Sequence, residues 1–156
     1  MTMTSAGSVK INPLTQADEP DWRRLWGAYQ RFYEVDLSEA VYASTWSRLL
    51  DPAEPIYGAI ARDANGEAVG LVHHIRHRTC WNTADSCYLQ DLYVDERGRG
   101  TGTGRALIAH VVEAAAEYGA AYVHWLTHET NARAMRLYDD VATRSGFVQY
   151  RVAVPG

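Results

Sequence analysis

The spacing of apolar residues along the chain predicts alternating helices and strands. Between residues 18 and 51 the apolar positions recur with the period of about 3.6 residues that is typical of amphipathic helices. Pro20 suits the first turn of one helix, and Pro52 follows the end of a second. The aromatic residues of these two helices include Trp22, Trp26, Tyr29, Tyr33, Tyr42 and Trp46. We expect them to pack in the core or, in part, to wall a ligand pocket.

Six short runs with apolar residues on one or both faces predict β-strands. They cover residues 9–13, 56–62, 67–78, 88–94, 121–127 and 147–154. Asn65-Gly66 lies between the second and third runs and predicts a tight hairpin. One further helix is predicted from Ala106 to Gly119, and another up to Val141 with Thr130 or Asn131 as the N-cap. The mixture favours an α/β (α+β) fold in one domain, residues 9–156, preceded by a flexible tail, residues 1–8.

The composition excludes several classes of protein. The 156 residues are 47% hydrophobic with a net charge of −4, and 14 of the 15 basic residues are arginine. No basic block indicates a nucleic-acid partner. No apolar run approaches the ~18 residues of a membrane span, and no signal pattern opens the chain, so we expect a cytoplasmic protein without a membrane partner. A homodimer is compatible with this composition.

Histidine and cysteine residues suggest neither a metal site nor a crosslink. His73 and His77 share one face of a predicted strand, but no third ligand accompanies them, so no metal is expected. Cys80 and Cys87 flank a loop. In a cytosolic chain two cysteines are more often free thiols than a disulfide.

A glycine-rich turn separates the strand 88–94 from the following helix. Glycines alternate with other residues from Gly98 to Gly104. Because glycine is costly in conformational entropy, this run indicates a close approach of the backbone to a ligand. Unpaired N–H groups and the positive dipole end at a helix start suit a phosphate or pyrophosphate. The spacing matches neither the P-loop, G-x-x-x-x-G-K-S/T, nor the dinucleotide fingerprint, G-x-G-x-x-G.

Two segments resemble the signatures of the GNAT superfamily of N-acetyltransferases. Arg99-Gly-Thr-Gly-Thr-Gly104 matches R/Q-x-x-G-x-G/A, directly after a strand. Asn131, Ala134 and Tyr138, followed by Gly146-Phe147, match the second signature, although the stretch between Tyr138 and Gly146 is longer than usual. The resemblance implies a central, mostly antiparallel mixed sheet flanked by helices and splayed at the cofactor-binding strand.

The resemblance also implies acetyl-CoA as the co-substrate. The glycine turn can hold its pyrophosphate through backbone N–H groups, with an arginine as charge partner. The strand before the turn is expected to pair with the pantetheine amides and to offer an N–H group to the oxyanion. The expected cofactor-binding residues are Leu92, Tyr93, Val94, Arg99, Gly100, Thr101, Gly102, Thr103, Gly104, Arg105, Asn131 and Tyr138.

Two catalytic residues are predicted. Tyr138 matches the tyrosine that the family often uses to protonate the leaving thiolate; otherwise it is a core residue. Some relatives carry Glu-Asp in the cofactor strand, whereas this chain has Gln90-Asp91, and Gln90 cannot accept a proton. Asp91 points to the opposite face of the strand and is either the general base or a structural hydrogen-bond acceptor. His74, Glu129 or water alone are the alternative bases.

The resemblance directs the search for the acceptor site to residues 29–46. The expected substrate-binding residues are Tyr29, Tyr33, Glu34 and Asp36, with Glu39 nearby. Carboxylates among aromatic side chains favour a primary ammonium, such as a small amine, a polyamine or a lysine side chain, over an acidic substrate. These carboxylates could equally be solvated charges of a loop.

The sequence thus predicts an N-acetyltransferase that moves the acetyl group of acetyl-CoA to a small-molecule or peptide amine by direct attack. The alternative is a non-catalytic acyl-CoA-binding regulatory module on the same fold. A nucleotide-binding domain of another type is disfavoured by the glycine spacing.

Overall fold

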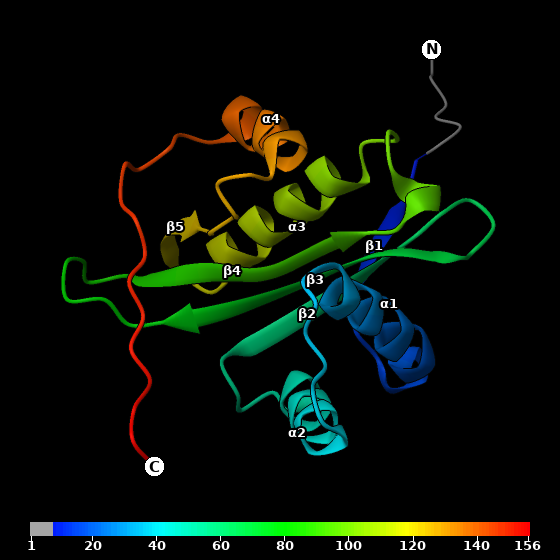
Figure 1. The fold of residues 1–156 in the computed structure, drawn as a ribbon, viewed down its shortest axis with the longest axis horizontal. Coiled ribbons are helices and arrows are strands. Elements are labelled where there is room, and N and C mark those ends of the chain that lie inside the picture. Colours follow the sequence, from blue (N-terminus) through cyan, green and yellow to red (C-terminus); the bar gives the residue numbers. More distant parts are fainter. Residues whose placement is uncertain (1–7) are drawn as a thin grey trace. The chain divides into compact units, whose positions relative to one another are not determined.

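The computed structural model describes residues 8–156 and divides the chain after Leu126 into two compact units. The described part of the first unit contains a five-stranded sheet in the order β1-β2-β3-β4-β5 (Figure 1). The strands are β1 (Lys10–Pro13), β2 (Ile56–Arg62), β3 (Ala68–His77), β4 (Asp85–Val94) and β5 (Ala120–His124). Neighbours are antiparallel from β1 to β4, and β5 runs parallel to β4. The predicted mostly antiparallel mixed sheet is confirmed. The predicted tail, residues 1–8, lies outside the described residues except for Ser8.

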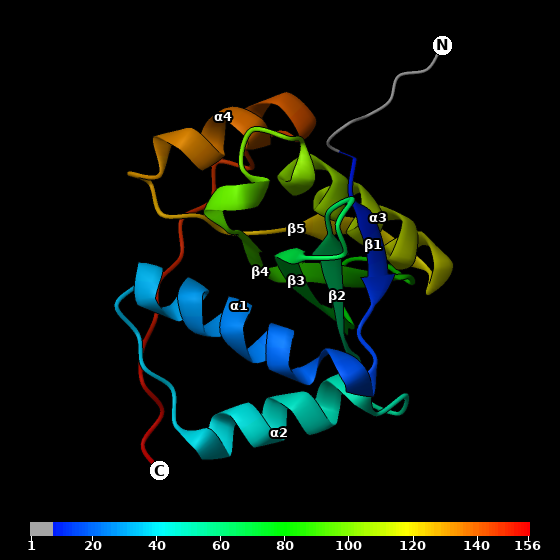
Figure 2. The same ribbon diagram turned by 90° about the vertical axis from the view of Figure 1, so that its right-hand side faces the viewer.

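Helices cover both faces of this sheet. Helices α1 (Glu19–Phe32) and α2 (Glu39–Leu50) lie on one face, and α3 (Thr103–Glu117) lies on the other (Figure 2). Two short 3-10 helices, η1 (Gln16–Asp18) and η2 (Glu96–Gly98), precede α1 and α3. Ser38 begins α2 because its side chain accepts a hydrogen bond from the Val41 N–H. No helix among the described residues is long and apolar enough to cross a membrane.

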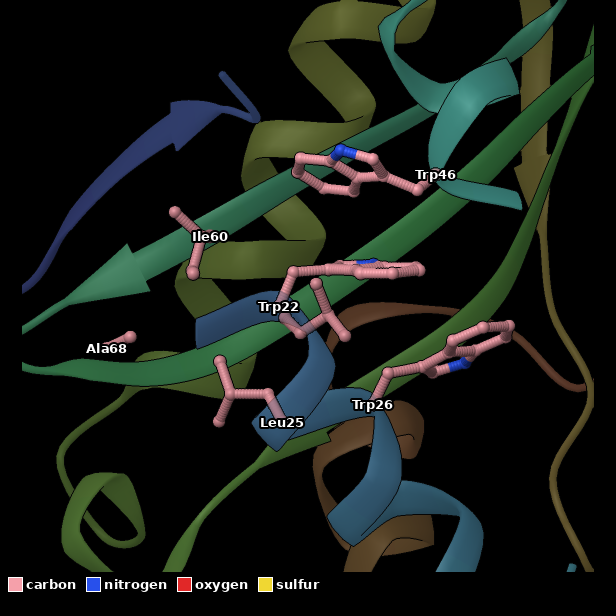
Figure 3. Packing of buried hydrophobic residues seen from close by; sticks show 7 residues of the cluster. Trp22, Leu25, Trp26, Trp46, Ile60 and Ala68 are labelled. Atoms are coloured by element: carbon pink, nitrogen blue, oxygen red, sulfur yellow. The ribbon is translucent and has the colours of Figure 1, made fainter. Parts of the chain in front are cut away.

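The indole rings of α1 and α2 form the core on the first face. Trp22 is fully buried, and its ring lies 5.1 Å from that of Trp26 and 4.8 Å from that of Trp46 (Figure 3). The cluster is completed by Leu25, Ile60, Ala68 and Leu71. Burying each large apolar side chain contributes about 1.5–3 kcal/mol. The expected core packing of the aromatic face is therefore confirmed at these three tryptophans.

The second unit contains one helix and no strand. Helix α4 (Ala132–Val141) begins at Asn131, whose side chain accepts a hydrogen bond from the Ala134 N–H. The predicted strand at residues 147–154 is wrong, because the chain is irregular there. Its alternating apolar pattern favours a strand locally, but a strand is stable only when it pairs with a neighbouring strand. Residues 127–156 contain no other strand.

A buried polar cluster supports the face of the sheet that α3 covers. The His74 ring stacks on Tyr57 at 5.1 Å, and its Nδ1 lies 3.1 Å from the Tyr118 hydroxyl. Burial, assisted by the nearby His110 and His73, lowers the pKa of His74 to about 4. Burial likewise raises the pKa of Tyr118. His74 therefore stays neutral at physiological pH, and protonating it opposes folding.

Acid is expected to destabilise the protein through His74. The pKa of His74 is about 4 when folded and about 6.5 when unfolded, so the unfolded chain binds an extra proton between these values. The unfolding free energy should therefore fall by up to about 3 kcal/mol as the pH drops from 6.5 to 4. Urea unfolding across this range checks it, with His74→Gln expected to show a shallower slope. The exposed His77→Gln is the control, and equal slopes for wild type and His74→Gln would contradict the assignment.

Candidate active site

Strand β4 continues beyond its neighbour β5. The pairing of these parallel strands ends at Tyr88 and His124, where β5 ends, whereas β4 runs on to Val94 (Figure 1). From Leu89 to Val94 this edge of β4 faces no strand among the described residues. The backbone amides of an unpaired edge can pair with an extended ligand. The predicted splay of the sheet at residues 88–94 is confirmed.

A β-bulge interrupts β4 at Gln90. His73 of β3 pairs with Asp91, and His74 pairs with Leu89, so Gln90 has no partner on β3. A bulge of this kind directs two successive residues to one side of the sheet. Gln90 and Asp91 accordingly both line the same cleft. The prediction that the two side chains point to opposite faces is wrong, because the bulge breaks the alternation of the strand.

Asp91 is held by a buried chain of two hydrogen bonds. Its Oδ2 lies 2.8 Å from Nδ1 of His73, whose Nε2 accepts the indole N–H of Trp22 at 2.9 Å. An indole nitrogen can only donate, so Nε2 of His73 carries no proton and Nδ1 donates to the Asp91 carboxylate. His73 is only 3% exposed, and the Trp26 ring packs edge-on against it at 5.4 Å. Asp91 thus accepts a hydrogen bond from His73, and its role as general base stays a prediction.

The cleft beside Asp91 has a volume of about 820 Å³ and lies between α1, α2 and the sheet. The α1 residues Trp26 and Gln30 form one wall with Tyr29 and Tyr33. The α2 residues Val41, Thr45 and Arg48 form the other wall, followed along the chain by Glu54, Pro55 and Ile56. His73, Ile75, Gln90 and Asp91 form the floor. The cleft therefore combines aromatic walls with charges of both signs.

Two of the four predicted substrate-binding residues line the cleft, and two do not. Tyr29 and Tyr33 line the cleft, whereas Glu34 and Asp36 are exposed in the loop after α1 and do not line it. Glu39 forms an ion pair with Arg23 at 2.8 Å. Arg48 and Glu54 were not among the predicted residues. Only the i, i+4, i+7 spacing of Val41, Thr45 and Arg48 could have indicated that one face of α2 meets a ligand.

The glycine turn has the backbone that its sequence predicts. Gly100 has φ +77° and Gly102, the N-cap of α3, has φ +83°, and no atom lies within 4 Å of the position a Cβ would take at either residue. Gly98 differs, because a Cβ there would meet Val94 at 3.0 Å. The left-handed backbone and the open space leave room for a phosphate at the start of α3.

Threonine hydroxyls stabilise the same turn. Thr101 Oγ1 donates to the Gly98 carbonyl at 2.5 Å, and so accepts from Thr103 Oγ1 at 2.8 Å. Arg99 Nε donates to the carbonyl of Val94 at 3.2 Å, which joins the turn to the end of β4. The other predicted cofactor residues in the first unit lie on β4 and α3. Leu92 and Tyr93 are in the part of β4 that pairs with β3 but not with β5, and Gly104 and Arg105 are in the first turn of α3.

The remaining predicted residues lie elsewhere. Asn131 and half-buried Tyr138 belong to α4 and its cap in the second unit, seven positions apart along the helix. Of the alternative bases, Glu129 is also in the second unit and is exposed. His74 stacks on Tyr57, on the α3 face of the sheet, whereas Asp91 lines the cleft on the opposite face.

The unpaired edge of β4 thus runs into a turn with open space for a phosphate, and a carboxylate of the same strand lines the cleft. Residues 19–141 match the Acetyltransferase (GNAT) family, so the chain belongs to this family. The predictions of a GNAT N-acetyltransferase and of acetyl-CoA as its co-substrate are confirmed.

Individual relatives agree with this assignment. The chain is 37% identical over 144 residues to D-amino-acid N-acetyltransferase HPA3 of Saccharomyces cerevisiae, covering 92% of this chain and 89% of that protein. AAC(6')-Iy in complex with a CoA bisubstrate analog has a TM-score of 0.83 at 16% identity, covering 95% and 99% of the two chains. Ribosomal-protein-alanine N-acetyltransferase from Brucella melitensis biovar Abortus 2308 has a TM-score of 0.74 at 22% identity, covering 94% and 100%. These two structures share the fold.

Cofactor binding is expected to depend on Gly102. Gly102→Val places a branched side chain where the backbone must approach phosphate, so acetyl-CoA affinity measured by calorimetry should fall at least ~10-fold, about 1.4 kcal/mol. Gly119→Val is a matched control, because Gly119 follows the other end of α3 with the same φ of +83° and equally open surroundings. Equal affinity losses in both variants would contradict a site at the glycine turn.

Proposed function

We propose that the protein transfers the acetyl group of acetyl-CoA to the amino group of an amino acid, with Asp91 as general base and Tyr138 as general acid. The observation that carries the proposal is the Asp91 carboxylate, oriented by buried His73 at the floor of a cleft that lies beside the unpaired edge of β4. The yeast relative named as a D-amino-acid N-acetyltransferase supports an amino acid, and in particular a D-amino acid, as the acceptor.

Acetyl-CoA would occupy the side of β4 that faces away from β3. The residues present fit it: the positive-φ glycines leave open space at the start of α3, and no side chain caps this helix. There the N–H groups would hold the pyrophosphate. The pantetheine would extend along Leu92 to Val94, which brings the thioester to the level of Asp91. Arg99 and Arg105 lie beside the turn and would add positive charge.

The acceptor would react by direct attack on the thioester. The acceptor enters as an ammonium, and the Asp91 carboxylate takes one proton from it, which frees the nitrogen lone pair to attack the carbonyl carbon. A C–N bond forms, and a backbone N–H on the edge of β4 stabilises the oxyanion. The C–S bond then breaks, Tyr138 donates its phenolic proton to the leaving thiolate, and the second proton lost by the nitrogen restores the Tyr138 phenol. The products are the N-acetylated acceptor and CoA.

His73 and Trp22 would act as positioning residues. The Nδ1–H of His73 binds one oxygen of Asp91 and sets the rotamer of the carboxylate, while the Trp22 indole sets the tautomer of His73. Because one Asp91 oxygen is occupied, the other is left for the amine. Side-chain exposure of 15% at Asp91 gives the acceptor access without full solvation of the carboxylate.

Asp91→Asn is expected to lower kcat/KM for D-phenylalanine by roughly 10²–10³-fold. The asparagine oxygen can still accept from His73, so the shape of the cleft is kept while the basic oxygen is lost. Steady-state release of CoA thiol measures the effect. Glu113→Gln, which removes an exposed carboxylate of α3, should leave the rate unchanged.

The same assay separates the competing acceptors. Faster turnover of spermidine or of a lysine peptide than of amino acids, together with dependence on Glu34 and Asp36, would favour the cationic acceptor predicted from the sequence. Binding of acetyl-CoA without turnover of any amine would favour a non-catalytic acyl-CoA-binding module.

Tyr138→Phe is expected to lower kcat by roughly 10²-fold while leaving acetyl-CoA affinity within a few-fold. The substitution keeps the ring and removes only the proton donor. Stopped-flow turnover at saturating substrates and calorimetry with acetyl-CoA measure the two quantities. An unchanged kcat, or a parallel loss of cofactor affinity and thermal stability, would assign Tyr138 a packing role.

A further inference from the structure

The cleft contains a positive charge, on the exposed side chain of Arg48, that no described group neutralises. Arg48 is in the last turn of α2 and is the one Lys or Arg among the described residues that line the cleft. Its side chain makes no hydrogen bond or ion pair with any described residue. The arginines that flank the core differ: Arg23 binds Glu19 and Glu39, and Arg62 binds Asp18. An unpaired guanidinium in a partly apolar cleft is suited to a carboxylate from outside, which matches its planar donor geometry.

We propose that Arg48 binds the α-carboxylate of the acceptor, so that the cleft recognises an amino acid as a zwitterion. This inference rests on the proposed function, in which Asp91 receives the amino group. Arg48 supplies the second charged contact, which makes free amino acids better substrates than simple amines.

Asp91 and Arg48 line the same cleft, Asp91 at its floor and Arg48 in its α2 wall. Asp91 pairs with His73, and Ile56 pairs with Ile75, so two strand spacings and two residue rises place the backbones of Asp91 and Ile56 roughly 12 Å apart. Arg48 belongs to the wall of the cleft that leads into Ile56. An α-amino acid hydrogen-bonded at both ends spans roughly 9 Å between the two protein groups. The long arginine side chain can close the remaining distance.

The other described polar groups of the cleft neither neutralise Arg48 nor offer a second guanidinium or ammonium for a carboxylate. Glu54 also lines the cleft, but it forms no ion pair with Arg48 and therefore does not neutralise the guanidinium. Gln30 uses its Oε1 to accept the Leu37 N–H, and its Nε2 is a buried donor without an acceptor among the described residues. The Nε2 donor of Gln30 therefore adds a second group in the cleft lining that could donate to an anionic group.

The aromatic wall of α1 supplies the third contact. With the amino group at Asp91 and the carboxylate at Arg48, the side chain of the acceptor would lie against Trp26, Tyr29 and Tyr33. Three contacts to three different substituents of one carbon distinguish the two enantiomers. Removing the Arg48 contact leaves two, so selectivity between D- and L-amino acids should depend on Arg48.

The test compares three acceptors that differ only in the group at the carboxyl position: D-phenylalanine, D-phenylalaninamide and phenethylamine. Arg48→Met should lower kcat/KM for D-phenylalanine by roughly 10- to 100-fold, mainly through KM, because a charge-assisted contact is lost. Turnover of phenethylamine should stay within about 3-fold of wild type, since that amine has no carboxylate. The ratio of D- to L-phenylalanine turnover should fall toward one.

Two further variants serve as controls. Arg31→Met removes the same charge from the last turn of α1, outside the cleft lining, and should leave all three acceptors unaffected. Arg48→Lys keeps the positive charge without the planar fork and should restore part of the activity toward D-phenylalanine.

Calorimetry of D-phenylalanine binding in the presence of CoA separates this inference from the proposed function. If wild type turns over no amine, the proposed function fails, and the affinity of Arg48→Met relative to wild type still decides the role of Arg48. A tenfold or greater loss of affinity for D-phenylalanine supports the inference. Unchanged affinity, or an equal loss for phenethylamine, would overturn it.

Discussion

The hydrogen bonds on either side of His73 connect the hydrophobic core to the Asp91 carboxylate. Trp22 can only donate its indole proton, so His73 must receive it on Nε2 and present Nδ1–H to Asp91. Trp22 is fully buried and His73 nearly so, and water therefore cannot replace the bond between these two side chains. An unsatisfied buried donor costs about 1–3 kcal/mol, which keeps the chain of bonds intact. The packing of α1 on the sheet thereby sets the orientation of Asp91.

Strand β4 lies between the cleft and the unpaired strand edge that leads to the glycine turn. Its bulge at Gln90 places Gln90 and Asp91 in the cleft under α1 and α2, and its unpaired edge continues to Val94 beside the glycine turn. In the proposed reaction, one strand would meet the acceptor on one side and offer its backbone to acetyl-CoA on the other. Such an arrangement would place the amine and the thioester close together without requiring a separate domain.

The charges of the cleft come from segments that are far apart in the sequence. Arg48 is on α2, Glu54 is in the connection to β2, and Asp91 is on β4. The acidic residues that stand out in the sequence lie elsewhere: Glu39 binds Arg23 at 2.8 Å, and Asp36 is exposed. The charge in a stretch of sequence thus differs from the charge that a ligand in the cleft meets.

The sequence by itself determined the features that depend on local backbone preferences. The hairpin at Asn65-Gly66, the Asn131 cap and the left-handed glycine at position 102 each follow from neighbouring residues. Tertiary structure decided the rest. The bond from Trp22 to His73 crosses 51 positions, and the bulge of β4 exists only through its pairing with β3. Residues 147–154 have the propensity of a strand but no neighbouring strand to pair with in their unit, so they form no strand.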